Sequence, residues 1–154
     1  MSADDILDGI AGSLTAAATS GRDRHAIEPA MLGFESLAKL VQEGKATWDH
    51  FRPWAAAHAE DVARARFALE EWSLWMGQEF RQGGEEGAER ALLLRSQLEF
   101  ARTVFAGTSA LETLEVISDE EGDVEFRHEA ERRALDPPDF VPRSHVWWRW
   151  TNGQ

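Results

Sequence analysis

The middle of the sequence carries a long stripe of mostly apolar side chains, and this stripe constrains the fold more than any other feature. From residue 54 onward its members recur at steps of three and four residues: Trp54, His58, Val62, Ala65, Leu69, Trp72 and Met76. Such steps place side chains along one narrow face of an α-helix, which then packs against a second helix. We therefore expect a long helix that runs on from Pro53, where proline predicts a kink or break. Phe67 and Trp75 lie off the stripe and predict a second neighbour.

A second stripe follows and supplies the packing partner. Its members also recur at steps of three and four residues: Ala91, Leu94, Leu98, Ala101 and Phe105. The Gly83-Gly84 pair between the stripes predicts a turn, and hence an antiparallel hairpin with arms of about 33 Å at ~1.5 Å per residue. Two earlier helices are predicted, one over residues 6–17 and one that starts at Pro29, a favoured first helical residue, and ends at Gly44. Residues 1–107 are thus predicted to form a four-helix body.

The pattern changes after residue 107. The stretches 114–118 and 124–128 alternate apolar and polar side chains, and the link between them is polar and contains a glycine. This combination predicts a β-hairpin. A competing interpretation is a short helix over 110–117, because Ser109 and Glu112 match a capping box. The β-branched side chains of Val116 and Ile117 favour the strand.

The tryptophan-rich stretch "SHVWWRW", residues 144–150, is the best candidate for a third strand, which an isolated hairpin needs for stability. On a strand, Trp148 and Trp150 would face the core, whereas Trp147 and Arg149 would face outward. Arg149 could then pair with Glu125 or stack on Trp147. The alternative is that all three tryptophans are structural. The predicted fold is mainly α (α+β): one domain over 1–154, with a helical body at 1–107 and a β-hairpin and tryptophan-rich tail at 108–154.

Negative charge is concentrated in one segment. The chain has a formal net charge of -12, and residues 112–131 hold nine carboxylates against Arg127 alone. This sign disfavours direct nucleic-acid binding and favours a basic protein partner, although a solubilising rim would have the same composition. The predicted partner-binding residues are Asp119, Glu120, Glu121, Asp123, Glu125, Trp147 and Arg149.

No motif predicts a specific reaction. The chain has no cysteine, which excludes thiol chemistry and fits a reducing, cytoplasmic setting. It has no nucleophile elbow and no phosphate-binding glycine loop. His58 and Asp61 are three residues apart and could form a metal pair on a helix, although a buried structural histidine is the more common case. The sequence indicates no cofactor.

Three functions remain open from the sequence. The first is a small acidic protein-binding module, such as an inhibitor or immunity-type protein that covers a basic nucleic-acid-binding or nuclease surface. The second is an accessory or scaffold subunit, or a homo-oligomer, that buries the stripes of 54–76 and 91–105 against a partner. The third is a metal-dependent enzyme that uses His58 and Asp61.

Overall fold

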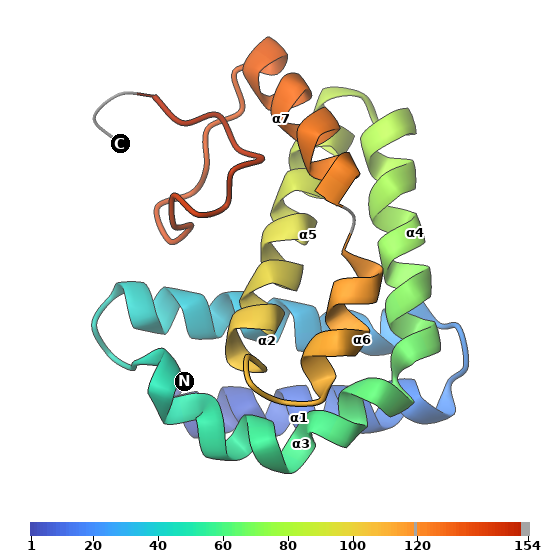
Figure 1. Ribbon diagram of the computed structural model, residues 1–154, viewed down its shortest axis with the longest axis vertical. Helices are drawn as coiled ribbons and strands as arrows, with labels where there is room; N and C mark the ends of the chain where they lie inside the picture. Colours follow the sequence, from blue (N-terminus) through green and yellow to red (C-terminus); the bar gives the residue numbers. More distant parts are fainter. Residues whose placement is uncertain (119, 152–154) are drawn as a thin grey trace.

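The computed structural model describes residues 1–118 and 120–151, and helices dominate this part of the chain. The α-helices are α1 (Ala3–Thr19), α2 (Arg24–Gln42), α3 (Arg52–Arg64), α4 (Arg66–Gln82), α5 (Gly84–Val104), α6 (Ala110–Ile117) and α7 (Glu120–Arg133), with a 3-10 turn at Trp48–Phe51. In Figure 1, α1, α2 and α3 lie across the lower half, and α4 and α5 stand upright above them. The described residues contain no β-strand, so the predicted sheet is wrong and the fold is all-α.

The first two helices pack side by side, and α2 starts earlier than predicted. Asp23 caps α2 by accepting a hydrogen bond from the backbone N–H of His25, so Pro29 lies inside the helix. A proline there interrupts the helical hydrogen-bond ladder. Ser13 of α1 repairs the gap: its hydroxyl donates to the Ala26 carbonyl at 2.7 Å and accepts from the Ala30 N–H at 3.1 Å.

The stripe of residues 54–76 is divided between two helices. The chain bends at Ala65, where the φ of -87° and ψ of 7° end α3 and begin α4. The single long helix predicted here is therefore wrong, although the apolar stripe is buried from Val62 to Met76. No glycine or proline marks this bend, which turns the chain from the transverse α3 into the upright α4 (Figure 1). Of the two side chains off the stripe, Trp75 packs under Arg24 of α2, whereas Phe67 is 54% exposed.

The antiparallel hairpin around Gly83-Gly84 is confirmed as α4 and α5 (Figure 1), although α4, with 17 residues, is shorter than the predicted arm. Its turn needs glycine at two positions. Gly84 has a φ of +68°, and a Cβ on Gly83 would lie 2.6 Å from the Cα of Gly87. The second stripe, from Ala91 to Phe105, is fully buried inside this chain.

Residues 110–117 and 120–133 are helical where a β-hairpin was predicted. Leu114 and Ile117 are three residues apart and are both buried, as are Phe126 and Ala130, which are four apart. These pairs fit helical spacing as well as the alternation fits a strand, and the neighbouring helices provide the surface that buries them. The competing prediction of a helix over 110–117 is confirmed as α6. Its capping differs, because the Thr108 hydroxyl, rather than Ser109, accepts the Ala110 N–H at 3.2 Å.

The predicted third strand is instead an irregular loop, residues 135–150, which we call the tryptophan loop. It is closed at its base by the Arg149 N–H, which donates to the Leu135 carbonyl at 3.0 Å, and by the Arg149 guanidinium, which donates to both carboxylate oxygens of Asp136. Arg149 therefore pairs with neither Glu125 nor Trp147. Since the backbone is not a pleated strand, Trp147 and Trp148 are both buried, and the prediction of an exposed Trp147 is wrong.

The length and hydrophobicity of the helices show whether any of them could span a membrane. Along the described part of the chain, no helix combines the length and the apolar character needed to cross a bilayer.

Candidate functional site

A pocket of about 480 Å³ lies between α5, α7 and the tryptophan loop. Each wall comes from one element. Arg95, Glu99 and Arg102 are spaced by four and three residues and share one face of α5. The α7 wall is formed by Asp123, Val124, Arg127 and His128, and the loop contributes Ser144, Val146 and Trp147. Three arginines thus meet in one hollow of an acidic protein.

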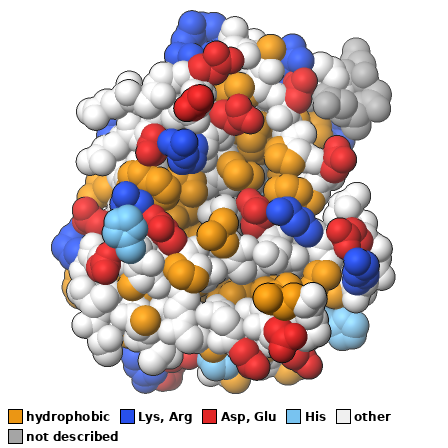
Figure 2. All heavy atoms as spheres, turned by 180° about the vertical axis from the view of Figure 1, so that it is seen from behind, with side chains coloured by type: hydrophobic (Ala, Val, Ile, Leu, Met, Phe, Trp, Pro, Cys, Tyr) orange, Lys and Arg blue, Asp and Glu red, His pale blue; other side chains and the backbone are white. Residues whose placement is uncertain are grey.

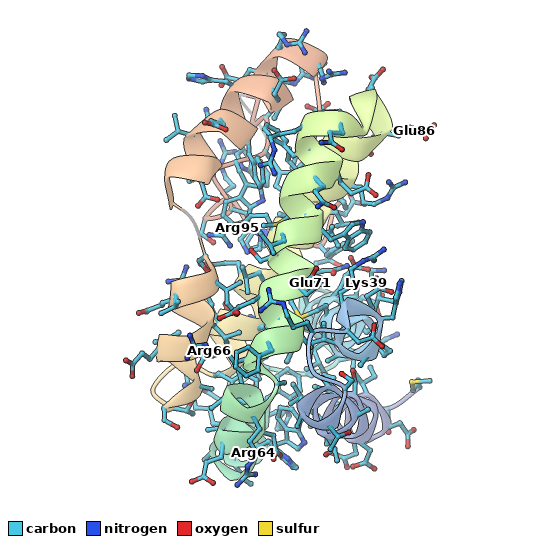
Figure 3. All side chains as sticks on the ribbon, turned by 90° about the vertical axis from the view of Figure 1, so that its right-hand side faces the viewer. Lys39, Arg64, Arg66, Glu71, Glu86 and Arg95 are labelled. Atoms are coloured by element: carbon cyan, nitrogen blue, oxygen red, sulfur yellow. The ribbon has the colours of Figure 1, made fainter. Side chains whose placement is uncertain are left out.

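Arg95 forms the floor of the pocket. Its side chain is only 3% exposed, and it donates to Asp123 of α7 through Nε at 2.7 Å and Nη2 at 3.0 Å. Its Nη1 donates to Glu99 at 3.3 Å, and its guanidinium carbon lies 4.1 Å from the centre of the Trp147 ring. A buried arginine with two carboxylates and an aromatic face is held rigidly. In Figure 3, Arg95 lies between α4 and α7 at the level where α6 gives way to α7.

Arg102 forms the second side of the pocket. Its Nη1 donates to Glu99 at 3.1 Å, and its Nη2 lies 3.7 Å from a carboxylate oxygen of Glu115 on α6. Its Nε is buried and has no hydrogen-bond partner in the structure. A buried N–H without a partner is costly, and because this atom has almost no accessible surface, an acceptor in the pocket would reach it only if the Arg102 side chain moved.

The mouth of the pocket combines one more arginine with apolar side chains. Arg127 donates through Nε to Glu131 at 2.9 Å and through Nη1 to the Val146 carbonyl at 3.2 Å, which ties α7 to the tryptophan loop. Val124 and Val146 are 57% and 51% exposed. A ligand that covered both valines would remove apolar surface from water.

Beneath the pocket lies a buried Ser96–His145 pair, which sequence reasoning did not find. His145 Nδ1 is 2.8 Å from the Ser96 hydroxyl, and the Trp148 indole N–H donates to the same hydroxyl at 2.9 Å. Burial lowers the pKa of His145 to about 3, and the nearby Arg95 charge contributes. The imidazole is therefore neutral near pH 7, and its Nδ1 shares a hydrogen bond with the Ser96 hydroxyl whose direction is set by the tautomer of the ring. Both residues are almost fully buried and neither lines the pocket, so the pair anchors the loop.

The predicted docking residues are not brought together on one face. Asp123 is bound to Arg95, Trp147 is buried, and Arg149 is bound to Asp136. Glu125 is exposed on α7. Glu120 and Glu121 start α7, but their side chains and all of Asp119 lie outside the described residues.

Arginines neutralise much of the acidic segment. Glu131 pairs with Arg127, and Glu129 accepts hydrogen bonds from both Arg132 and Arg133 at 2.8 Å. The bonds from Arg132 and then Arg133 lower the pKa of Glu129 to about 2. On the face shown in Figure 2, acidic and basic side chains are likewise interspersed.

The candidate metal pair is a hydrogen-bonded pair on α3. His58 Nδ1 lies 2.8 Å from Asp61 Oδ2, and Arg64 donates to the other oxygen of Asp61 at 3.2 Å. The His58 ring also lies against Trp54, with ring centres 4.7 Å apart. Across the described residues, no third histidine or carboxylate completes a metal-binding group at this or any other place.

Comparison with known proteins adds no relative. No protein-family model, no curated protein and no solved structure matches this chain.

Proposed function

We propose that this protein is a binding protein that holds a small molecule in the pocket between α5, α7 and the tryptophan loop. The observation that carries the proposal is the rigid floor. Arg95 is buried, fastened to Asp123 and Glu99, and stacked on Trp147 at the base of a 480 Å³ hollow.

The composition of the pocket supports this proposal. Small-molecule sites are concave, of roughly 300–1,000 Å³, and combine apolar walls with a few fixed polar groups. Here the apolar part is provided by Val124, Val146 and Trp147, and the polar part by arginines that other side chains already position. Positioned groups raise affinity because a ligand need not pay for ordering them.

The proposal can be tested without assuming the charge of the ligand. A fragment library of anionic, neutral and cationic compounds is screened by ¹H–¹⁵N NMR, with the indole N–H of Trp147 as reporter. Val146→Trp should block the mouth and abolish binding. Val116→Trp is the matched control, because Val116 is 73% exposed on α6 and does not line the pocket. If no fragment shifts the Trp147 signal, or if hits bind Val146→Trp as well as the control, the proposal is wrong.

A second candidate function is the acidic protein-binding module predicted from the sequence. The observation that favours it is a hollow between α4 and α6 beside exposed apolar side chains. Leu74 and Val116 line this hollow, and Phe67 is exposed two helical turns before Leu74. Glu112 and Glu115 are exposed on the neighbouring α6. In Figure 3, Arg66 lies on the side of α4 that faces α6.

The partner that fits this second candidate is a protein with a basic surface, such as a nucleic-acid-binding or nuclease surface. Affinity purification from the native host at low and high salt tests it. Replacing Glu112, Glu115 and Glu125 with Ser should slow association with a captured partner, since charge steers encounter. An association rate that neither salt nor these replacements change would exclude this candidate. The stripes of 54–76 and 91–105, proposed as scaffold contacts, are largely buried within the chain and are not available to a partner.

A further inference from the structure

We infer that the pocket between α5, α7 and the tryptophan loop takes an uncharged ligand with an apolar body and a head that donates a hydrogen bond to Glu99, as a primary amide does. The inference rests on the proposed binding function. Three features of the pocket carry it: the balance of charge among its side chains, a carboxylate oxygen that remains open, and the apolar surface at the mouth.

The charges around the pocket nearly cancel. The arginines that line it are Arg95, Arg102 and Arg127. They are paired with four carboxylates: Asp123, Glu99, Glu115 and Glu131. The last two are 52% and 54% exposed, so water screens them more strongly than the groups inside the pocket. Neither an anion nor a cation therefore meets an unbalanced opposite charge that would offset the loss of its own hydration.

Glu99 provides the acceptor for a ligand. Both of its side-chain bonds, from Arg95 Nη1 at 3.3 Å and from Arg102 Nη1 at 3.1 Å, go to Oε2. Oε1 accepts a hydrogen bond from none of the described residues, yet it is not shut off from solvent. Among the described side chains that are not exposed, Arg102 Nε is the one polar atom that lacks both a partner and accessible surface. Since Glu99 lines the pocket, Oε1 is the oxygen left to meet a ligand.

The second carboxylate of the lining is not available in this way. Both oxygens of Asp123 accept hydrogen bonds from Arg95. The acceptor that the pocket offers on a carboxylate therefore comes from α5, through Glu99, and not from α7.

A neutral donor suits this oxygen better than an ion does. A hydrogen bond to a carboxylate is charge-assisted and stronger than one between neutral groups. An ammonium at Oε1 would lie near the guanidinium groups of Arg95 and Arg102, and a carboxylate would be repelled by Glu99 itself. A primary amide avoids both conflicts. Its carbonyl can also accept from Arg127 Nη2, because the other two nitrogens of that guanidinium are already bonded.

The apolar body of the ligand has its own surface. Val124 and Val146 are exposed and line the pocket with Trp147. A short aryl or alkyl body would cover the two valines and remove their apolar surface from water.

A matched ligand series tests the inference. The probes share a phenyl body with a short linker: 3-phenylpropanamide, 4-phenylbutan-2-one, 3-phenylpropanoate and 3-phenylpropylammonium. The first two have nearly the same shape and differ in that the amide NH₂ is a methyl group in the ketone. Each is titrated at pH 8 while the Trp147 indole is followed by NMR. We expect the amide to bind about tenfold more tightly than the ketone, and several-fold more tightly than either ion.

Variants assign the preference to its acceptor. In Glu99→Gln, the amide oxygen can keep the bonds from Arg95 and Arg102, which turns an NH₂ donor towards the ligand. The preference for amide over ketone should then fall to near one. Glu115→Gln is the matched control: it makes the same change on a carboxylate that contacts Arg102 from α6 but does not line the pocket, and it should keep the preference. Melting temperatures show whether each variant is folded.

The outcomes separate the two proposals. If library fragments bind in the pocket but the amide does not bind more tightly than the ketone and the two ions, the inference is wrong and the binding function stands. The inference is also wrong if folded Glu99→Gln keeps the preference. Should Glu99→Gln fail to fold, the comparison of amide with ketone on the natural protein decides. If no compound of any charge binds the natural protein, both proposals fail.

Discussion

Arg95 and Asp123 are joined by two hydrogen bonds, from Nε to Oδ1 at 2.7 Å and from Nη2 to Oδ2 at 3.0 Å. This pair fastens the acidic helix α7 to the buried helix α5. The fastening matters because α7 buries few apolar side chains of its own, namely Phe126 and Ala130.

The first prediction concerns this fastening. Asp123→Ala should lower the free energy of unfolding by about 2–3 kcal/mol, since it leaves a buried guanidinium with only Glu99 as a partner. Amide hydrogen exchange across 124–130 should speed up more than in α5. Glu125→Ala, on the exposed side of the same helix, should change stability by less than about 0.5 kcal/mol. Equal stability of the two variants would show that the pair does not hold α7.

A second prediction concerns the repair of α2 by Ser13. Ser13→Ala should destabilise the protein by about 1–3 kcal/mol, because it leaves the buried Ala30 N–H without its acceptor. Denaturant unfolding measures the loss. Pro29→Ala removes the ring that disturbs the helix, so that the Ala30 N–H can bond directly to the Ala26 carbonyl; the change should therefore cost less, or stabilise, when introduced into Ser13→Ala. Additive effects of the two changes would contradict the proposed repair.

Two glycines form a third, paired prediction. A Cβ on Gly33 of α2 would lie 2.9 Å from Ile10 Cδ1 and closer still to Cγ1, whereas a Cβ on Gly12 of α1 meets nothing within 4 Å. Gly33→Ala should therefore cost about 1–3 kcal/mol through overpacking. Gly12→Ala should stabilise α1 by up to about 1 kcal/mol, since alanine is the better helix former. Thermal unfolding of both variants against the natural protein is the measurement.

The fourth prediction concerns pH. The pKa of His145 falls from 6.5 to about 3 on folding. The unfolded chain therefore binds the extra proton first, and stability that is complete above pH 6.5 is lost as the pH falls towards 3. Between pH 7 and 4.5 this amounts to roughly 2–3 kcal/mol at most. Glu129, with a pKa lowered from 4.5 to about 2, contributes mainly below that window, because its stabilisation is lost as the pH falls from 4.5 towards 2.

Two variants isolate the histidine. His145→Gln should flatten the dependence of unfolding free energy on pH between 7 and 4.5. His128→Gln, which removes an exposed histidine, should leave it unchanged. The assignment fails if the slope survives in His145→Gln.

The helical stripes were predictable from the sequence because burial and helical spacing coincide in them. Leu69, Trp72 and Met76 lie on one face and are buried, as their spacing predicts. The bend at Ala65 was not predictable, because the stripe continues through it without a glycine or proline. The strand prediction failed for a different reason. Over the five residues 114–118, Leu114 and Val116 alternate as on a strand and Leu114 and Ile117 are spaced as on a helix, and only the packing surface of neighbouring helices selects one of the two.

The candidate pocket could not be predicted from the sequence, because its walls come from segments that lie far apart in the chain. Arg95, Glu99 and Arg102 form a visible stripe on α5, but such spacing also describes an ordinary solvated helix face. The burial of Arg95 depends on α7 and on the tryptophan loop, which lie about 30 and 50 residues away in the chain. Trp147 was predicted to be exposed because a strand was predicted over residues 144–150, and neighbouring side chains on a strand face opposite ways. The loop instead buries Trp147 and Trp148 together.

The indole of Trp148 and the imidazole of His145 both meet α5 at the single hydroxyl of Ser96. Synthesis proceeds from the amino terminus, so a growing polypeptide must complete α5 some forty residues before it acquires the groups that cover this side of the helix. Until then the Ser96 side of α5 is uncovered, and its exposed apolar surface can bind chaperones or other chains. Truncated chains that end before residue 145 should therefore aggregate or bind chaperones, whereas the 154-residue chain, once released from the ribosome, should not.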